Sequence, residues 1–110
     1  MAYDEELADR IRAEVAGERG VTEMKMFGGL AFLIGGHMAV AASGQGGLML
    51  RCDPDDSERL VAEPGASRME MRGKEMDGWL RVTGDAVADD AALSRWVGVG
   101  TSYAASLPAK

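Results

Sequence analysis

The chain has 110 residues, of which 46% are hydrophobic and 27% charged, a composition that fits one folded domain and excludes a disordered chain. Its formal net charge of −6 argues against general coating of nucleic acid, because an acidic surface repels phosphates unless its basic side chains gather on one face. One cysteine, Cys52, cannot form an internal disulfide, and neither a signal peptide nor an apolar run of about 20 residues is recognisable, so we expect a cytoplasmic protein without a membrane span.

The first predicted element is a helix over residues 4–16. Leu7, Ile11 and Val15 recur every four residues and form one apolar stripe. Acidic residues fill its first turn, where the helix dipole favours negative charge. We expect the stripe to pack against the rest of the domain.

Short segments separated by glycines follow the helix and have the patterns of strands. The predicted strands cover residues 21–27, 30–34, 37–43 and 48–52. The pair Gly35-Gly36 suits a two-residue hairpin turn, and strands joined by so short a turn must be antiparallel. This half of the chain therefore predicts an antiparallel sheet.

The second half returns to helix, then strand, then helix. Asp53 and Pro54 mark the start of a short helix over residues 53–62. Strands are predicted around residues 69–71 and at 79–82, with a loop over residues 73–78 between them, and Asp89 caps a final helix that Pro108 ends. Gly98 and Gly100 interrupt that helix, which suggests a bend or a close helix-on-sheet contact.

The predicted fold class is α+β, as one domain over residues 1–110. It has two layers, with an antiparallel sheet of about five to six strands and three helices. The order is one helix, three to four strands, a helix, two strands and a helix.

The sequence contains no recognisable catalytic, cofactor-binding or metal-binding motif. His37 is the sole histidine, and no nucleophile elbow accompanies it. Cys52 shares strand phase with Leu48 and Leu50, which predicts a buried, unreactive thiol. The acids around Asp53 lack the spacing of a calcium loop, so helix capping explains them. We therefore expect no enzymatic activity, no cofactor and no metal.

Eight methionines stand out in a chain of this length. Methionine-rich surfaces bind varied partners. The alternation of the strands instead predicts that five of them turn inward, so core filling is the preferred interpretation. These five are Met24, Met26, Met38, Met69 and Met71.

The opposite phase predicts a solvent-facing sheet surface that is cationic although the chain is acidic. Aromatic and arginine anchors around an apolar centre are typical of protein interfaces, whereas a wet sheet face with scattered apolar residues is the plainer interpretation. The candidate partner surface consists of Lys25, Leu33, His37, Met49, Arg51, Arg72, Trp79 and Arg81. Its predicted partner is a second copy of the chain, as a homodimer, or an acidic protein.

Three stretches resemble the TfoX N-terminal domain family. They are the run Lys25-Met26-Phe27-Gly28-Gly29-Leu30-Ala31-Phe32-Leu33 with Gly36-His37-Met38-Ala39-Val40, the pair Met69-Glu70-Met71-Arg72-Gly73 and Gly78-Trp79-Leu80-Arg81-Val82, and the ending Tyr103-Ala104-Ala105-Ser106-Leu107-Pro108. The resemblance implies a compact α+β domain related to secretion-chaperone-like folds, which often pair through their sheets.

The same resemblance implies a regulatory role linked to transcription, since the family is associated with bacterial competence and its best-known members act with a cyclic-AMP receptor transcription factor. It supplies no catalytic residues. The expected function is therefore a non-enzymatic regulatory or protein-interaction domain. Two alternatives stay open. One is a small anionic ligand-binding protein or enzyme that uses His37, Lys25 and Arg51. The other is a weak nucleic-acid binder that uses Arg51, Arg72 and Arg81, with Trp79 stacking on a base. Direct nucleic-acid binding is disfavoured by the net charge.

Overall fold

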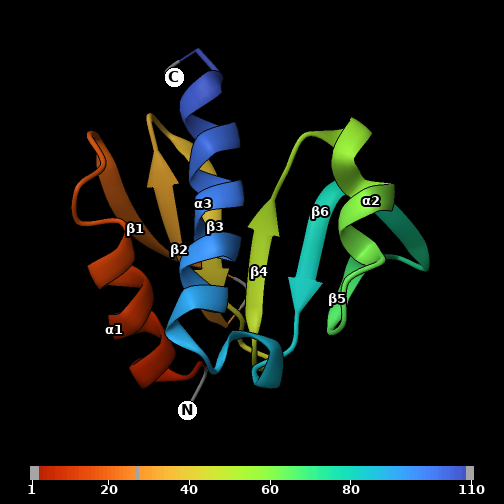
Figure 1. Cartoon of the computed structure of the whole chain (residues 1–110). Helices are drawn as coiled ribbons and strands as arrows, with labels where there is room; N and C mark the ends of the chain where they lie inside the picture. Colours follow the sequence, from red (N-terminus) through yellow and green to blue (C-terminus); the bar gives the residue numbers. More distant parts are fainter. Residues whose placement is uncertain (1–2, 27, 109–110) are drawn as a thin grey trace.

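A six-stranded antiparallel sheet carries all three helices on one of its faces (Figure 1). The structure is a computed structural model and describes residues 3–26 and 28–108, without the side chain of Met71. Phe27, which the first strand was predicted to include, and Met71, which was predicted to point inward, lie outside this description. The α+β fold and the order of its elements are confirmed. No helix in the described residues is long and apolar enough to cross a bilayer.

The elements begin and end close to their predicted limits, with one large exception in the sheet and a smaller one at β5, which begins at Ala66 although residues 69–71 were predicted. The helices are α1 (Glu5–Glu14), α2 (Ser57–Val61) and α3 (Asp90–Ser106), with single 3-10 turns η1 (Pro54–Asp56) and η2 (Asp85–Val87). The strands are β1 (Val21–Met26), β2 (Gly29–Ile34), β3 (His37–Ala42), β4 (Leu48–Arg51), β5 (Ala66–Met71) and β6 (Lys74–Val82).

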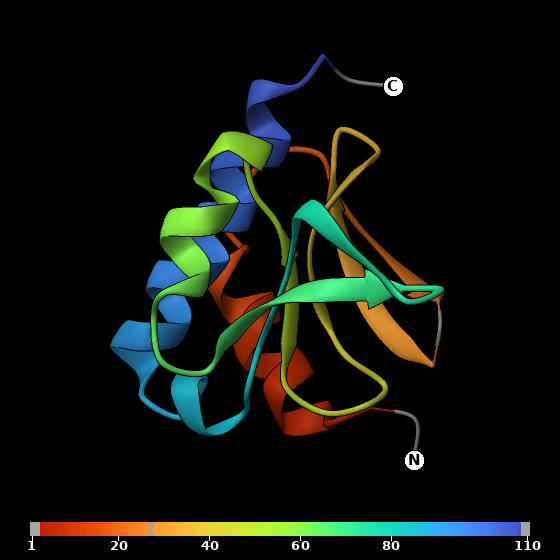
Figure 2. The same cartoon turned by 90° about the vertical axis from the view of Figure 1, so that its right-hand side faces the viewer.

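The large exception is β6, which begins at Lys74 instead of after the loop predicted for residues 73–78. Only Arg72 and Gly73 form the turn, both with positive φ, at 53° and 79°, as a two-residue hairpin turn of this hand requires. The polar residues after Gly73 belong to a hairpin arm that extends away from the helix layer (Figure 2). Because both sides of this arm are exposed, its sequence lacks the alternation of polar and apolar residues that predicts a strand.

The strands follow the order β1-β2-β3-β4-β6-β5 across the sheet, and every neighbouring pair is antiparallel. The sheet edges are thus β1 and β5. The chain leaves β4 through α2, forms the edge strand β5 first, and then returns as β6 between β5 and β4.

The main core lies between the sheet and the helices. Ile11 of α1 is fully buried, and so are Leu50 of β4 and Leu80 of β6, two interior strands of the sheet. Trp96 of α3 packs into the same cluster. Cys52 belongs to it as well, with 1% of its surface exposed, so its predicted burial is confirmed.

Helix α3 lies unusually close to β3 at one glycine. A Cβ atom built on Gly100 would overlap the carbonyl oxygen of Ala39 and lie 2.7 Å from a methyl carbon of Val40, whereas one built on Gly98 would meet nothing within 4 Å. The predicted close contact of helix on sheet is therefore present at Gly100. Ala39 and Ala104 pack together at this crossing.

A β-bulge in β3 changes the face to which Met38 belongs. The register pairs Phe32 with Val40 but Leu33 with Met38, so Ala39 is the extra residue. Met38 consequently packs with Leu33 on the open face. The prediction that Met38 shares a face with Val40 and Ala42 is wrong, because the alternation restarts at the bulge.

The edge strand β1 has the opposite orientation to the predicted one. Lys25 pairs with Leu30 and Glu23 with Phe32; since directly opposed residues share a face, Lys25 and Glu23 lie on the helix side. There Glu23 accepts hydrogen bonds from Arg12 of α1, at 2.6 Å and 2.9 Å. Met24 and Met26 lie on the open face. The alternation in an edge strand indicates which of its residues share a face. It does not indicate which of the two faces the helices cover.

Candidate functional site

The open face of the sheet contains a cleft of about 430 Å³ between its two curled edges. Strands from one edge, β1, to the other, β5, contribute side chains to it. The lining consists of Met24, Met26, Leu33, Gly36, Met38, Met49, Arg51, Met69, Met76 and Trp79. Six of these ten residues are methionines, and Arg51 is the only charged one.

The base of the cleft is a second, smaller apolar cluster. Ala31, Leu33, Ala41 and Met49 are each at most 8% exposed, although no helix covers this side. Half-buried side chains surround them, and they are Met26, Met69 and Trp79. The curled sheet and its own methionines therefore shield the open face in place of a helix.

Met24 on β1 extends this apolar surface outward. It is 51% exposed, and it is the one large hydrophobic side chain with this much exposure in the described chain. The predicted inward phase of Met24, Met26 and Met69 is wrong: all three line the cleft. An exposed methionine beside a buried cluster marks this as the apolar part of the surface.

Arg51 is the last residue of β4 and lies beyond the end of the pairing between β3 and β4. The ladder between β3 and β4 ends at Val40 and Leu50, one residue before Arg51. The guanidinium carbon lies 4.9 Å from the ring centre of Trp79 on the open face and 5.3 Å from that of Tyr103 on α3. Two aromatic rings thus hold one cation at the boundary of the two faces.

The polar contacts of Arg51 are incomplete. Its Nε is buried and has no hydrogen-bond partner, which is true of no other buried side-chain nitrogen or oxygen in the described residues. No described carboxylate lies within ion-pair distance of it. An unsatisfied buried donor is costly, so Arg51 is the group in the cleft best suited to gain from a bound acceptor.

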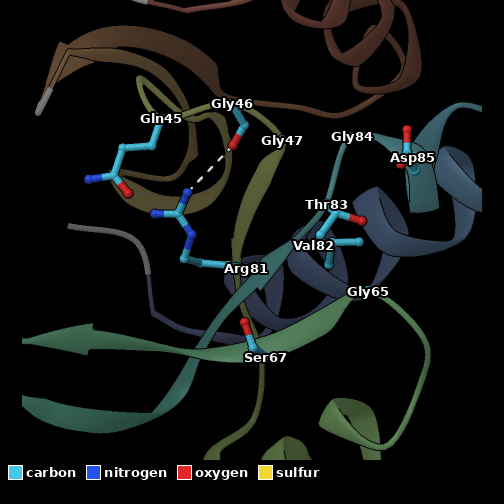
Figure 3. Close-up of a pocket in the computed structure, with 10 residues that line it drawn as sticks. All are labelled: Gln45, Gly46, Gly47, Gly65, Ser67, Arg81, Val82, Thr83, Gly84 and Asp85. Carbon is cyan, nitrogen blue, oxygen red and sulfur yellow. Dashed lines mark hydrogen bonds between the residues drawn. The ribbon is translucent and has the colours of Figure 1, made fainter.

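A second concavity of about 460 Å³ lies where the β3–β4 loop meets the end of β6 (Figure 3). Its lining is mainly glycine and polar residues. Arg81 extends across it towards Gly46, and its Nη2 donates to the carbonyl of Gly46 at 3.5 Å and to the hydroxyl of Ser43 at 3.3 Å. Asp85 lies at the opposite end. Because Arg81 already bonds to the protein, this groove offers less to a ligand than the methionine cleft.

Four of the eight residues of the candidate partner surface come together in the cleft: Leu33, Met49, Arg51 and Trp79. Arg81 pairs with Met49 across β4 and β6, on the same face, but its side chain reaches into the polar groove. The predicted surface is thus partly assembled.

The other three residues of that surface lie elsewhere. Lys25 faces the helix side of β1. His37 reaches the end of α3, with its Nε2 at 2.6 Å from the carbonyl oxygen of Pro108. Arg72 is exposed in the turn between β5 and β6. The anion site predicted from His37, Lys25 and Arg51 together is therefore not formed, because only Arg51 reaches the cleft.

The residues that the sequence analysis failed to assign to the site are five of its six methionines, all except Met49. One of the five, Met76, lies inside the segment predicted as a loop. The signal in the sequence was the high number of methionines, but this number was interpreted as core filling.

Few side chains in or near the cleft could act as an acid, a base or a nucleophile. Cys52 lies on the helix side, where burial raises the pKa of its thiol, and a protonated thiol is a poor nucleophile. Its Sγ lies 3.8 Å from Ser57 Oγ, which accepts a hydrogen bond from the Gly78 amide. No cluster of three or more metal-ligating side chains occurs among the described residues.

Comparison with protein families matches residues 13–104 to the TfoX N-terminal domain. None of the curated proteins and none of the solved structures matches the chain. The matched residues include all six strands, the methionine cleft and nearly all of α3. Since the match covers most of the chain, as the resemblance of its Met-Phe-Gly-Gly stretch predicted, this protein belongs to the TfoX N-terminal domain family.

Proposed function

We propose that this chain is a non-catalytic regulatory domain that acts by binding an apolar group in the methionine cleft of its open sheet face. The observation that carries the proposal is the cleft itself: about 430 Å³, lined by six methionines, Leu33 and Trp79, with one cation at its end. Small-molecule sites have volumes of about 300–1,000 Å³ and are mostly apolar with a few placed polar groups. The regulatory part of the proposal, linked to transcription, rests on the family.

The absence of a general acid, base or nucleophile from the cleft lining supports binding over catalysis. Its one charged side chain is Arg51, whose guanidinium donates hydrogen bonds and accepts none. Such a group can orient an acceptor. A binding role needs no more than this.

A protein partner is the second candidate for the cleft. Methionine side chains are flexible and adapt to different apolar shapes, and Met24 carries the apolar surface beyond the cleft onto the edge strand β1. In that case an apolar side chain of an acidic protein, or of a second copy of this chain, would enter the cleft. Nucleic acid is disfavoured, because the arginines predicted to hold it do not lie together.

The test uses N-phenyl-1-naphthylamine, a neutral fluorescent probe whose emission rises in apolar sites. We expect saturable binding by the wild-type chain and a loss of about tenfold in affinity for the double variant Met38→Gln/Met76→Gln, which keeps the side-chain length and removes apolar surface. The matched control is Leu107→Gln at the far end of α3, which should bind as wild type. Equal binding by all three proteins would contradict the proposal.

Sedimentation velocity on the same proteins examines the second candidate. A dimer that the cleft variant abolishes and the control retains would identify a second copy as the occupant. A monomer that binds the neutral probe would favour a small ligand.

A further inference from the structure

The methionine cleft has a charge opposite to that of the chain around it. The chain carries a net charge of −6, and yet no acidic side chain lines the cleft, where Arg51 is alone. Elsewhere the described arginines commonly pair with carboxylates: Arg10 with Asp90, Arg12 with Glu23, Arg68 with Asp77 and Arg95 with Glu63. A cation left without its counter-charge at the end of an apolar cleft favours a ligand that brings the negative charge itself.

The position of the guanidinium is fixed before any ligand binds. Trp79 and Tyr103 lie against it at 4.9 Å and 5.3 Å, which limits the rotamer freedom of a long side chain. A group held in place loses little conformational entropy on binding. Its planar fork of donors matches a carboxylate, which can accept two hydrogen bonds from it.

The number of cations limits the charge of the ligand. Lys25 and His37 lie on the helix side, and Arg81 bonds to the β3–β4 loop, so one guanidinium faces the cleft. A phosphate monoester carries nearly two charges at neutral pH, and its second charge would have no partner here. A carboxylate carries one, and its charge would be matched.

We propose that the cleft binds a small amphipathic carboxylate, with its apolar chain or ring among the methionines and its carboxylate on Arg51. This inference rests on the proposed function and names the ligand class of the same site. The methionines tolerate either a chain or a ring, because an unbranched thioether repacks around different shapes. Met24, which is 51% exposed, adds solvent-accessible apolar surface on the β1 side of the cleft.

The test compares decanoate with decanol, which shares its chain and lacks its charge, both below the concentration at which they form micelles. Displacement of N-phenyl-1-naphthylamine reports the affinity, and circular dichroism checks that each variant is folded. Wild type should bind decanoate at least about tenfold more tightly than decanol, since hydrogen bonds to charged groups contribute that much or more.

Two variants separate the charge of Arg51 from other causes. Arg51→Met should remove the preference for decanoate and leave decanol binding within about twofold, because methionine fits the rest of the lining. Arg81→Met, which removes the other arginine of the same face, should keep the preference. If Arg51→Met fails to fold, the comparison of the two ligands on wild type decides alone.

The two proposals fail in different ways. Equal affinity of wild type for decanoate and decanol would overturn the carboxylate inference and leave an apolar binding cleft standing. A preference that survives Arg51→Met would overturn it as well, because the charge would then be recognised elsewhere. If neither compound displaces the probe and the probe itself does not bind, the proposed function and the inference fall together.

Discussion

The two faces of the same six-stranded sheet are built in different ways. On the helix side, branched and aromatic side chains such as Leu50 and Phe32 of the sheet pack in one cluster with Trp96 of α3, and all three are at most 3% exposed. On the open side, methionines surround a cleft that no helix fills. Stiff side chains define one packed arrangement, whereas flexible thioethers permit several. The first face therefore provides the packed core, and the second holds the cleft that we propose binds a ligand.

Charge follows the same division. The ion pairs of Arg12 with Glu23 and of Arg95 with Glu63 lie on the helix side and tie a helix to the rest of the chain. Arg51, on the boundary with the open face, has aromatic rings for neighbours, and no ion pair joins it to a described carboxylate. Ion pairs on the helix side thus join elements of the fold, whereas Arg51 beside the proposed binding cleft forms no ion pair with a described carboxylate.

The largest expected difference between the faces is the cost of removing one side chain. Leu50→Ala should lower the free energy of unfolding by about 2–5 kcal/mol, because it leaves a cavity in a packed core. Met76→Ala, at the half-buried lining of the cleft, should cost no more than about 1 kcal/mol. Chemical denaturation of both variants measures this. Equal losses would mean that the open face contributes to stability as the core does.

The contact between α3 and β3 gives a second, smaller contrast within one helix. Gly100→Ala should destabilise the protein by about 1–3 kcal/mol, because the added methyl group collides with the Ala39 carbonyl. Gly98→Ala is the matched control and should stabilise by about 0.5–1 kcal/mol, since alanine is the better helix former and space is open there. Thermal melts compare them. A Gly100→Ala variant as stable as Gly98→Ala would contradict the close approach.

Oxidation distinguishes the two faces by reactivity. With limiting hydrogen peroxide, Met24 should form its sulfoxide well before Cys52 reacts, because Met24 is 51% exposed and Cys52 only 1%. The raised pKa of the buried thiol slows Cys52 further, since the thiolate is the reactive form. Peptide mass mapping over time measures the order. Reaction of Cys52 first would show that the helix-side core opens more readily than its packing implies.

The smallest expected effect is at the ion pair between Arg95 and Glu63. Hydrogen bonds from Arg95 lower the pKa of the Glu63 carboxyl below its ordinary value of 4.5, so the pair stabilises the fold above that value and the contribution is lost as the pH falls through the lowered pKa. Both side chains are partly exposed, at 49% and 31%, which limits the effect to under about 1 kcal/mol.

The measurement is the difference in stability between wild type and Glu63→Gln as a function of pH. The difference should be present at pH 7 and should shrink in acid, once the wild-type carboxyl is protonated. Glu58→Gln on α2, outside the described ion pairs, is the control and should show a smaller dependence. A difference that grows in acid would contradict the direction of the pKa shift.

Much of the candidate site was within reach of the sequence. The alternation of β4 and β6 placed Met49, Arg51 and Trp79 on one face correctly, because both are interior strands that pair with each other without a register change over those residues. The phase of β1 came out inverted, and Met38 was assigned to the wrong face. The first error arose at an exposed edge and the second at a bulge, and both features depend on partners distant in sequence.

By itself the sequence determined the kinds of element, their order, the antiparallel pairing and the burial of Cys52, because periodicity, glycine turns and helix caps act over a few neighbouring residues. Only the tertiary structure decided which face the helices cover at the sheet edge, and that six methionines and Arg51 meet in one cleft. The curvature of the sheet and the register of its strands bring together residues that span 53 positions of the chain, from Met24 to Met76. A pattern within a few neighbouring residues cannot specify contacts between residues so far apart in the sequence.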